Sequence, residues 1–174
     1  MMKALSILLS VLIATPAIAQ ELPLESHFHG IESCYGRTYS AAHLDKHPDQ
    51  QVIDIGISHF PTKQQLLGMD SPNQPYPDTP KFVAKLALFK RGQDIRWEAD
   101  AFCEPDGKRI KCNLECDAGN FYLTEHKSGG LLLTGGSDLS FDSCDAGDRT
   151  LMREPDDTSF LLQSVPRSIC VPPK

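Results

Sequence analysis

The clearest pattern in the chain is an alternation of apolar and polar positions with a period of two. In segment 52–58, Ile53, Ile55 and Ile57 share one face, and small or polar residues occupy the other. This spacing predicts a β-strand with one buried face. Segment 82–89 is apolar on both faces apart from Lys85, which predicts a central strand.

Further strands are expected wherever short apolar runs stand between turn signals. Turns marked by Asp, Asn, Gly and Pro recur about every 8–12 residues, a rhythm typical of antiparallel sandwiches and barrels. We therefore expect a mainly β fold, an antiparallel meander of seven or eight strands that forms a small barrel or a curled sheet. The additional predicted strands are 95–103, 110–116, 121–125, 131–134, 159–165 and a weaker one at 139–141.

One short N-terminal helix is expected to precede these strands. Ser40 is a suitable N-cap. Pro48 ends the helix, because the residue before a proline leaves the α region, and the predicted helix therefore covers 41–47. The proline-rich segment 60–80 predicts a long loop, of a length that is often functional.

The first 19 residues have the pattern of a cleavable signal peptide. Lys3 is followed by an apolar run, and Ala17-Ile18-Ala19 offers small residues for cleavage before Gln20. The run is shorter than the roughly 20 residues of a spanning helix, so no membrane anchor is expected after cleavage. The predicted organisation is a signal peptide (1–19), a flexible arm (20–31) and a single β-rich domain (32–174) in the periplasm or secreted.

Six cysteines follow the predicted signal peptide, and an even number in an exported chain predicts disulfides. Two of them flank the turn Pro105-Asp106-Gly107 and so lie on adjacent strands, while the outermost two could tie the ends of the domain together. Spacing alone leaves other connectivities open. The favoured pairing joins Cys103 with Cys112, Cys34 with Cys170 and Cys116 with Cys144.

The composition and the motifs exclude several classes of function. The chain has 17 basic and 23 acidic residues, so a nucleic-acid partner, which requires a cationic surface, is not expected. No nucleophile elbow, P-loop or dinucleotide fingerprint occurs. No catalytic residue and no cofactor are predicted. Four acidic residues on neighbouring strands would suit either a solvated face or, less simply, a hydrolase site; they are Glu98, Asp100, Glu104 and Glu115.

Two histidines suggest a metal site. His43 and His47 are four positions apart on the expected helix, so both imidazoles lie on one face and could share a metal ion. His27 and His29 in the arm could add ligands. The Glu that follows the first His in zinc proteases is replaced here by Leu44. Exposed polar residues are the simpler interpretation.

The segment Cys34-Tyr35-Gly36-Arg37-Thr38-Tyr39-Ser40-Ala41-Ala42-His43-Leu44, followed by His47-Pro48, resembles part of small exported bacterial proteins of no established function. The resemblance extends to the hairpin cysteines and the Glu115-Cys116-Asp117 turn. It implies an exported bacterial domain and supplies no catalytic residues. If the segment is a binding site, Arg37, Tyr39 and His43 are its polar groups, although Arg37 could equally neutralise a carboxylate of the fold.

The sequence therefore predicts an exported, non-enzymatic binding or interaction module, with a hydrolase-inhibitor-like β-domain as one possible form. Its partner would be a protein or a small ligand that contacts loop 61–80 and the mouth of the barrel. A metal-binding protein that uses His43 and His47 is the main alternative, and a small secreted hydrolase is a weaker one.

Overall fold

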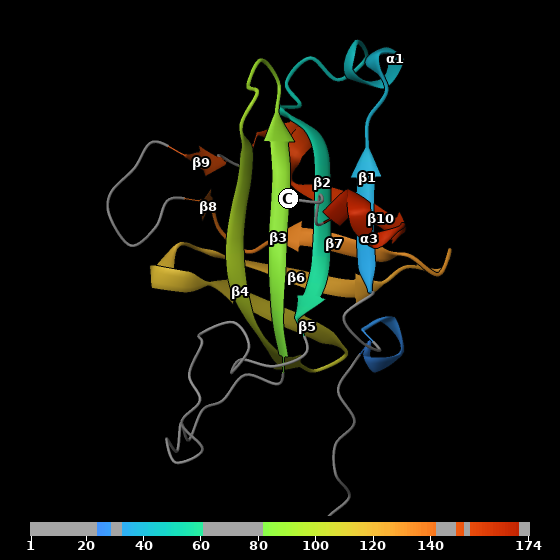
Figure 1. Ribbon diagram of the computed structural model, residues 1–174, viewed down its shortest axis with the longest axis vertical. Helices are drawn as coiled ribbons and strands as arrows, with labels where there is room; N and C mark the ends of the chain where they lie inside the picture. The colour runs from blue at the N-terminus through green and yellow to red at the C-terminus, as the bar shows by residue number, and fades with distance from the viewer. Residues whose placement is uncertain (1–23, 29–32, 61–81, 142–148, 152–153, 171–174) are drawn as a thin grey trace, which may run out of the picture.

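The computed structural model describes residues 24–28, 33–60, 82–141, 149–151 and 154–170. Within this part, eight strands close into an antiparallel barrel in the order β1-β10-β7-β6-β5-β4-β3-β2 (Figure 1). This confirms the predicted mainly β meander, and it selects the barrel over the open sheet. The strands are β1 (Cys34–Thr38), β2 (Val52–Phe60), β3 (Phe82–Lys90), β4 (Arg96–Asp106), β5 (Arg109–Leu114), β6 (Asn120–Glu125), β7 (Leu131–Gly135) and β10 (Ser159–Ser164).

The remaining elements surround the barrel. Strands β8 (Leu139–Ser140) and β9 (Thr150–Leu151) pair with each other as a separate two-stranded sheet. Helix α1 and the 3₁₀ turn η1 lie at opposite ends of the barrel in Figure 1. None of the described helices is long and apolar enough to cross a membrane. The helical elements are η1 (Glu25–His27), α1 (Ala41–Leu44), η2 (Glu115–Asp117), η3 (Pro155–Asp157) and α3 (Arg167–Cys170).

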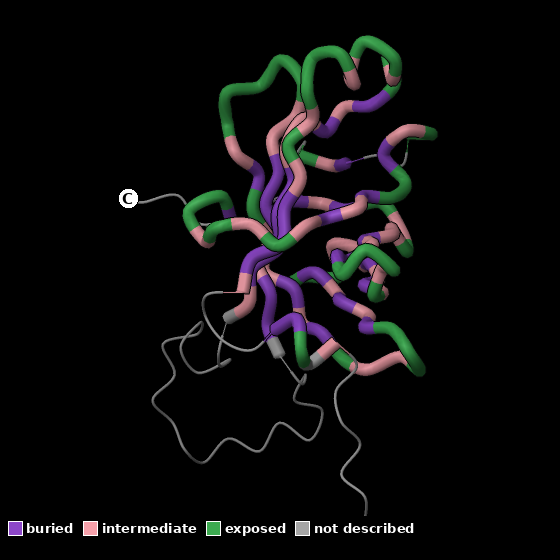
Figure 2. The backbone as a smooth tube through the Cα atoms, turned by 90° about the vertical axis from the view of Figure 1, so that its right-hand side faces the viewer, coloured by how far each residue is buried: buried purple, intermediate pink, exposed green. Residues whose placement is uncertain are grey.

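Apolar side chains pack the interior of the barrel. Inward-facing residues alternate along the strands except at a bulge in β2, and Figure 2 shows buried positions along the strands and exposed ones at the turns. The largest fully buried side chains include Phe121, Ile57, Leu86 and Leu133. An eight-stranded barrel is just wide enough for side chains to fill it. The interior is therefore a hydrophobic core.

The structure contains the two disulfides that the sequence favoured for these four cysteines. Cys103 and Cys112 are directly opposite on β4 and β5, with sulfur atoms 2.06 Å apart, and both residues have no exposed surface. Cys34 and Cys170 have sulfur atoms 2.00 Å apart. Cys116 is also disulfide-bonded, whereas residue 144 lies outside the described residues. Disulfides of this kind indicate an oxidising environment.

A bulge in β2 shows that the prediction of one shared face for Ile53, Ile55 and Ile57 is wrong for Ile53. The register with β3 shifts between Val52 and Asp54, so Ile53 does not share the inward face of Ile55 and Ile57. Val52 takes that place and is fully buried. The extra residue of a bulge changes which side chains point inward.

The carboxylate of Asp157, in η3, holds this bulge. It accepts hydrogen bonds from the backbone N–H groups of Gln51 (2.7 Å) and Val52 (3.2 Å). Asp157 is 4% exposed. Burial raises the pKa of its carboxyl group above the ordinary value of 3.8, against the opposing effect of the two N–H groups and Lys90.

We expect this raised pKa to make Asp157 destabilising as it ionises. The folded protein binds the proton more readily than the unfolded chain, so the free energy of unfolding decreases as pH rises from 3.8 through the folded-state pKa. Urea unfolding of the wild type and of Asp157→Asn at a series of pH values measures this. The wild type should lose stability relative to the variant as pH rises; a constant difference would contradict the prediction.

The sequence did not predict β1 or α3, and in the structure α3 packs against β1. On the outer face of the barrel, Gly36 of β1 is paired with Gly56 of β2. A Cβ atom at Gly36 would lie 3.2 Å from Cγ2 of Val165, and one at Gly56 would lie 3.2 Å from Sγ of Cys170. The glycine pair thus lets the C-terminal segment lie directly on the sheet, where the Cys34–Cys170 bond fixes it.

Three further expectations need correction. The helix predicted over 41–47 ends at Leu44, although Ser40 caps it as predicted, its Oγ accepting from the N–H of His43 at 3.2 Å. The weak strand at 139–141 exists as β8 but lies outside the barrel, and β1 closes the barrel instead. Part of the predicted arm is packed, because the Phe28 ring is 6% exposed and tilted against Tyr35. Segments 1–19 and 61–80 lie outside the described residues.

Candidate functional site

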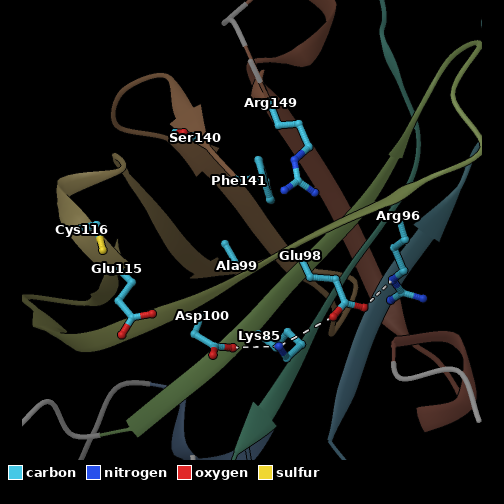
Figure 3. A pocket seen from close by; sticks show the side chains of 10 residues that line it. All are labelled: Lys85, Arg96, Glu98, Ala99, Asp100, Glu115, Cys116, Ser140, Phe141 and Arg149. Atoms are coloured by element: carbon cyan, nitrogen blue, oxygen red, sulfur yellow. Dashed lines mark ion pairs between the residues drawn. The ribbon is translucent and has the colours of Figure 1, made fainter. Parts of the chain in front are cut away.

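A groove of about 430 Å³ lies on the outer face of the barrel, over β3 and β4 and next to η2 and the β8–β9 sheet (Figure 3). We call it the charged groove, because three basic and three acidic side chains line it. Phe141 and Ala99 supply apolar surface. The lining residues are Lys85, Arg96, Glu98, Ala99, Asp100, Glu115, Cys116, Ser140, Phe141 and Arg149.

The floor of the charged groove is a ladder of ion pairs. Lys85 is directly opposite Asp100 across β3 and β4, and its Nζ lies 3.0 Å from Asp100 Oδ1 and 3.7 Å from Glu98 Oε2. Glu98 Oε1 in turn lies 3.3 Å from Nε of Arg96. Because outward residues recur every second position, Arg96, Glu98 and Asp100 fall in one row. The two basic and two acidic side chains of the floor therefore balance in charge.

Arg96 also links the groove to the C-terminal helix. Its guanidinium donates to the backbone carbonyl of Ile169 at 3.2 Å and to that of Cys170. The side chain is therefore held at three points, by Glu98 and by the two carbonyls, which fixes this end of the row of charges.

The walls come from segments that are distant in sequence. Glu115 and Cys116 belong to η2, where Cys116 and Asp117 have positive φ angles of 60° and 55°. Non-glycine residues in this conformation are strained and need support from their surroundings. The Ser140 N–H donates to the Ala118 carbonyl at 2.9 Å, which joins the β8–β9 wall to η2.

The residues of the N-terminal segment that were predicted as a binding site meet at the other candidate site. Arg37, Tyr39, His43 and His47 form what we call the aromatic column. The Arg37 Cζ lies 5.3 Å from the centroid of the Tyr39 ring, and the Tyr39 and His43 rings are stacked 4.7 Å apart. His43 and His47 are stacked 4.3 Å apart with an angle of 19° between their planes.

Buried neighbours fix the orientation of His43. The Nε2 of Gln50, a residue that is 2% exposed, donates to the carbonyl of Val52 at 2.7 Å. The Oε1 of Gln50 therefore faces Nε2 of His43, 3.0 Å away, and accepts a hydrogen from it. At the end of the column, Nδ1 of His47 lies 3.4 Å from Oδ1 of Asp156.

The predicted metal ligands are adjacent but do not converge. A metal ion binds in the plane of an imidazole ring. Because the two rings are stacked and nearly parallel, their nitrogen lone pairs do not point toward a common position. His27 lies instead against Tyr35, 5.6 Å between centroids, and His29 is outside the described residues. Within the described ranges, no group of three or more His, Cys, Asp or Glu side chains could hold a metal ion. Shared coordination by His43 and His47 would need one ring to turn.

The sequence singled out the acidic half of the charged groove and missed the basic half. Glu98, Asp100 and Glu115 line it, whereas Glu104 is opposite Lys111 on β5, away from it. Lys85 had a detectable signal, because it is the single charge inside an otherwise apolar strand. Arg149 had none, since its place on the wall depends on the packing of β8 and β9.

Comparison with protein-family models, with curated proteins and with solved structures finds no match for this chain. Its function is therefore inferred from the geometry of the charged groove and the aromatic column.

Proposed function

We propose that this protein is an exported, non-enzymatic binding module whose charged groove takes a segment of a partner protein. The observation that supports this most is the location of the concavity. Side chains fill the interior of the barrel, where eight-stranded barrels otherwise hold a small ligand. Concave surface lies outside instead: the charged groove on β3 and β4, and a second hollow of about 410 Å³ bordered by α1, β2 and α3.

The charges of the groove suit recognition better than catalysis. Side chains of both signs at fixed places favour one partner and one orientation over others. Hydrolysis of a glycoside would need two carboxylates free to act as acid and as base or nucleophile. Glu98 and Asp100 are instead both occupied by ion pairs with Lys85 and Arg96. A hydrolase-inhibitor-like role is one form that such a module would take.

The charge of Glu115 provides the test. Glu115 is an exposed residue on the groove wall, and Glu125 is an exposed residue at the end of β6, so Glu125→Lys is a matched control for Glu115→Lys. Immobilised wild type and both variants are used to capture proteins from a periplasmic extract, and the bound proteins are quantified by mass spectrometry.

We expect a specific partner that wild type and Glu125→Lys retain equally and that Glu115→Lys retains at least about tenfold less. Reversal of the charge places Lys opposite the cationic group that Glu115 contacts in the partner, and about 1.4 kcal/mol of such repulsion already lowers the affinity tenfold. Equal retention by all three proteins would overturn the assignment to the groove. Stoichiometric zinc binding that is lost in His43→Ala/His47→Ala, without any captured partner, would support the metal-binding alternative instead.

A further inference from the structure

Arg37 differs from Arg91 and Arg109 in what its guanidinium contacts. Arg91 donates to the carbonyls of Leu44 and His47, and Arg109 is paired with Asp106 at 2.7 Å. In the part of the chain that the structure describes, Arg37 makes neither an ion pair nor a hydrogen bond. The guanidinium instead makes a cation–π contact with the face of the Tyr39 ring.

The guanidinium of Arg37 is therefore available to a ligand. Arg37 is half-buried. It lies on the inward face of β1, two positions after the buried Tyr35 and opposite Ile55. A guanidinium carries five N–H donors, and none of those of Arg37 is among the buried side-chain atoms without a partner in the described residues. The sequence left open that Arg37 neutralises a carboxylate of the fold, and none of the described carboxylates does so.

The nearby acidic groups are already engaged. Asp156 is paired with His47, and Asp157 accepts from the backbone of Gln51 and Val52. Both carboxylates nevertheless contribute negative potential at the column, and Asp157 acts on Tyr39 directly. An anion that carries one charge is therefore favoured here over a phosphate dianion.

Tyr39 supplies a second donor beside Arg37. Burial raises the pKa of its hydroxyl above 10.0, Arg37 lowers it and Asp157 raises it further, so the hydroxyl stays protonated and able to donate. No hydrogen-bond partner for this hydroxyl occurs among the described residues. His43 stacks on the ring, and Gln50 in turn orients His43. Because its ring is held in this way, Tyr39 loses little conformational entropy when its hydroxyl binds a ligand.

We propose that Arg37 and Tyr39 form a carboxylate-binding site at the α1 end of the barrel, separate from the charged groove. The planar fork of the guanidinium donates two parallel hydrogen bonds to the two carboxylate oxygens, as this geometry allows. The Tyr39 hydroxyl donates a third. His43 and Gln50 are positioning residues. The carboxylate belongs to a small organic acid or to the C-terminus of a peptide, two sources of the same chemistry.

The test compares carboxylates with their neutral amides. The full chain with its disulfides intact is titrated with benzoate and with benzamide, and with a tripeptide that has either a free or an amidated C-terminus. Binding is followed by the NMR signal of the Arg37 Nε–H group. We expect saturable shifts with benzoate, with the free tripeptide or with both, and none with the amides. The better carboxylate identifies the source.

Variants separate this site from a general effect of charge. We expect Arg37→Gln to weaken the binding by about tenfold or more and Tyr39→Phe to weaken it by a few fold, as expected for hydrogen bonds to a charged group. Arg109→Gln, at an exposed arginine elsewhere, should leave it unchanged. Circular dichroism confirms folding, and Arg37→Lys, which keeps the charge but not the fork, should lie between Arg37→Gln and wild type.

Three results would overturn the proposal: equal shifts with the amides, undiminished binding by Arg37→Gln, or no saturable shift with either carboxylate. The charged groove is tested independently, because Glu115→Lys is expected to leave carboxylate binding unchanged. Either site can fail without the other.

Discussion

Replacement of the outer disulfide by alanine, in Cys34→Ala/Cys170→Ala, is expected to lower the free energy of unfolding by about 4–5 kcal/mol. The two residues are 136 apart in sequence, so the bond removes much of the freedom of the unfolded chain. It also holds α3 on the glycine pair of β1 and β2. Urea unfolding of the variant and of the wild type measures the loss.

The inner disulfide serves as the comparison. Cys103 and Cys112 are 9 apart, so chain entropy alone predicts a loss of about 3 kcal/mol for Cys103→Ala/Cys112→Ala. If this variant lost more stability than Cys34→Ala/Cys170→Ala, packing of the sulfurs in the core would outweigh loop closure. An unchanged midpoint for Cys34→Ala/Cys170→Ala would contradict the prediction outright.

A single methyl group at Gly119 is expected to cost about 3 kcal/mol or more. Gly119 has a φ of 102°, a region that strains any other residue. A Cβ atom there would lie 2.1 Å from the carbonyl oxygen of Asp138, a backbone atom that cannot simply rotate away. Gly119→Ala would therefore separate the loop between η2 and β6 from the segment that leads into β8.

Gly92→Ala is the matched control for this substitution. Gly92 also has a positive φ, 73°, but a Cβ atom there would have no heavy atom within 4 Å. Its expected loss is about 1 kcal/mol, which is the cost of the backbone conformation alone. Thermal unfolding of both variants gives the difference. Equal losses would show that the contact with Asp138 is not a constraint.

The candidate sites were accessible from the sequence to different degrees. Arg37, Tyr39 and His43 lie within one segment of seven residues, and in the structure they are neighbours. The charged groove combines β3 and β4 with η2 and the β8–β9 sheet. Its acidic residues alternate along predicted strands, but nothing local indicates which basic residues face them.

The sequence by itself determined the features that depend on near neighbours. A period of two predicts β4, a doubly apolar run predicts β3, and a turn signal places Cys103 and Cys112 on adjacent strands, because these are local properties of the backbone and its side chains. The structure corrects the turn: Pro105 and Asp106 still belong to β4, the chain reverses at 107–108, and the resulting register sets Cys103 opposite Cys112. Only the tertiary structure decided how the barrel closes. β1 is hidden in the sequence because α3 covers its outer glycine and Arg37 stands on its inner face. The Asp157 carboxylate, more than 100 positions away, sets the bulge that moves Ile53 off the inward face. Contacts over such separations leave no periodic trace in the chain, so their outcome depends on packing and on the pairing of distant polar groups.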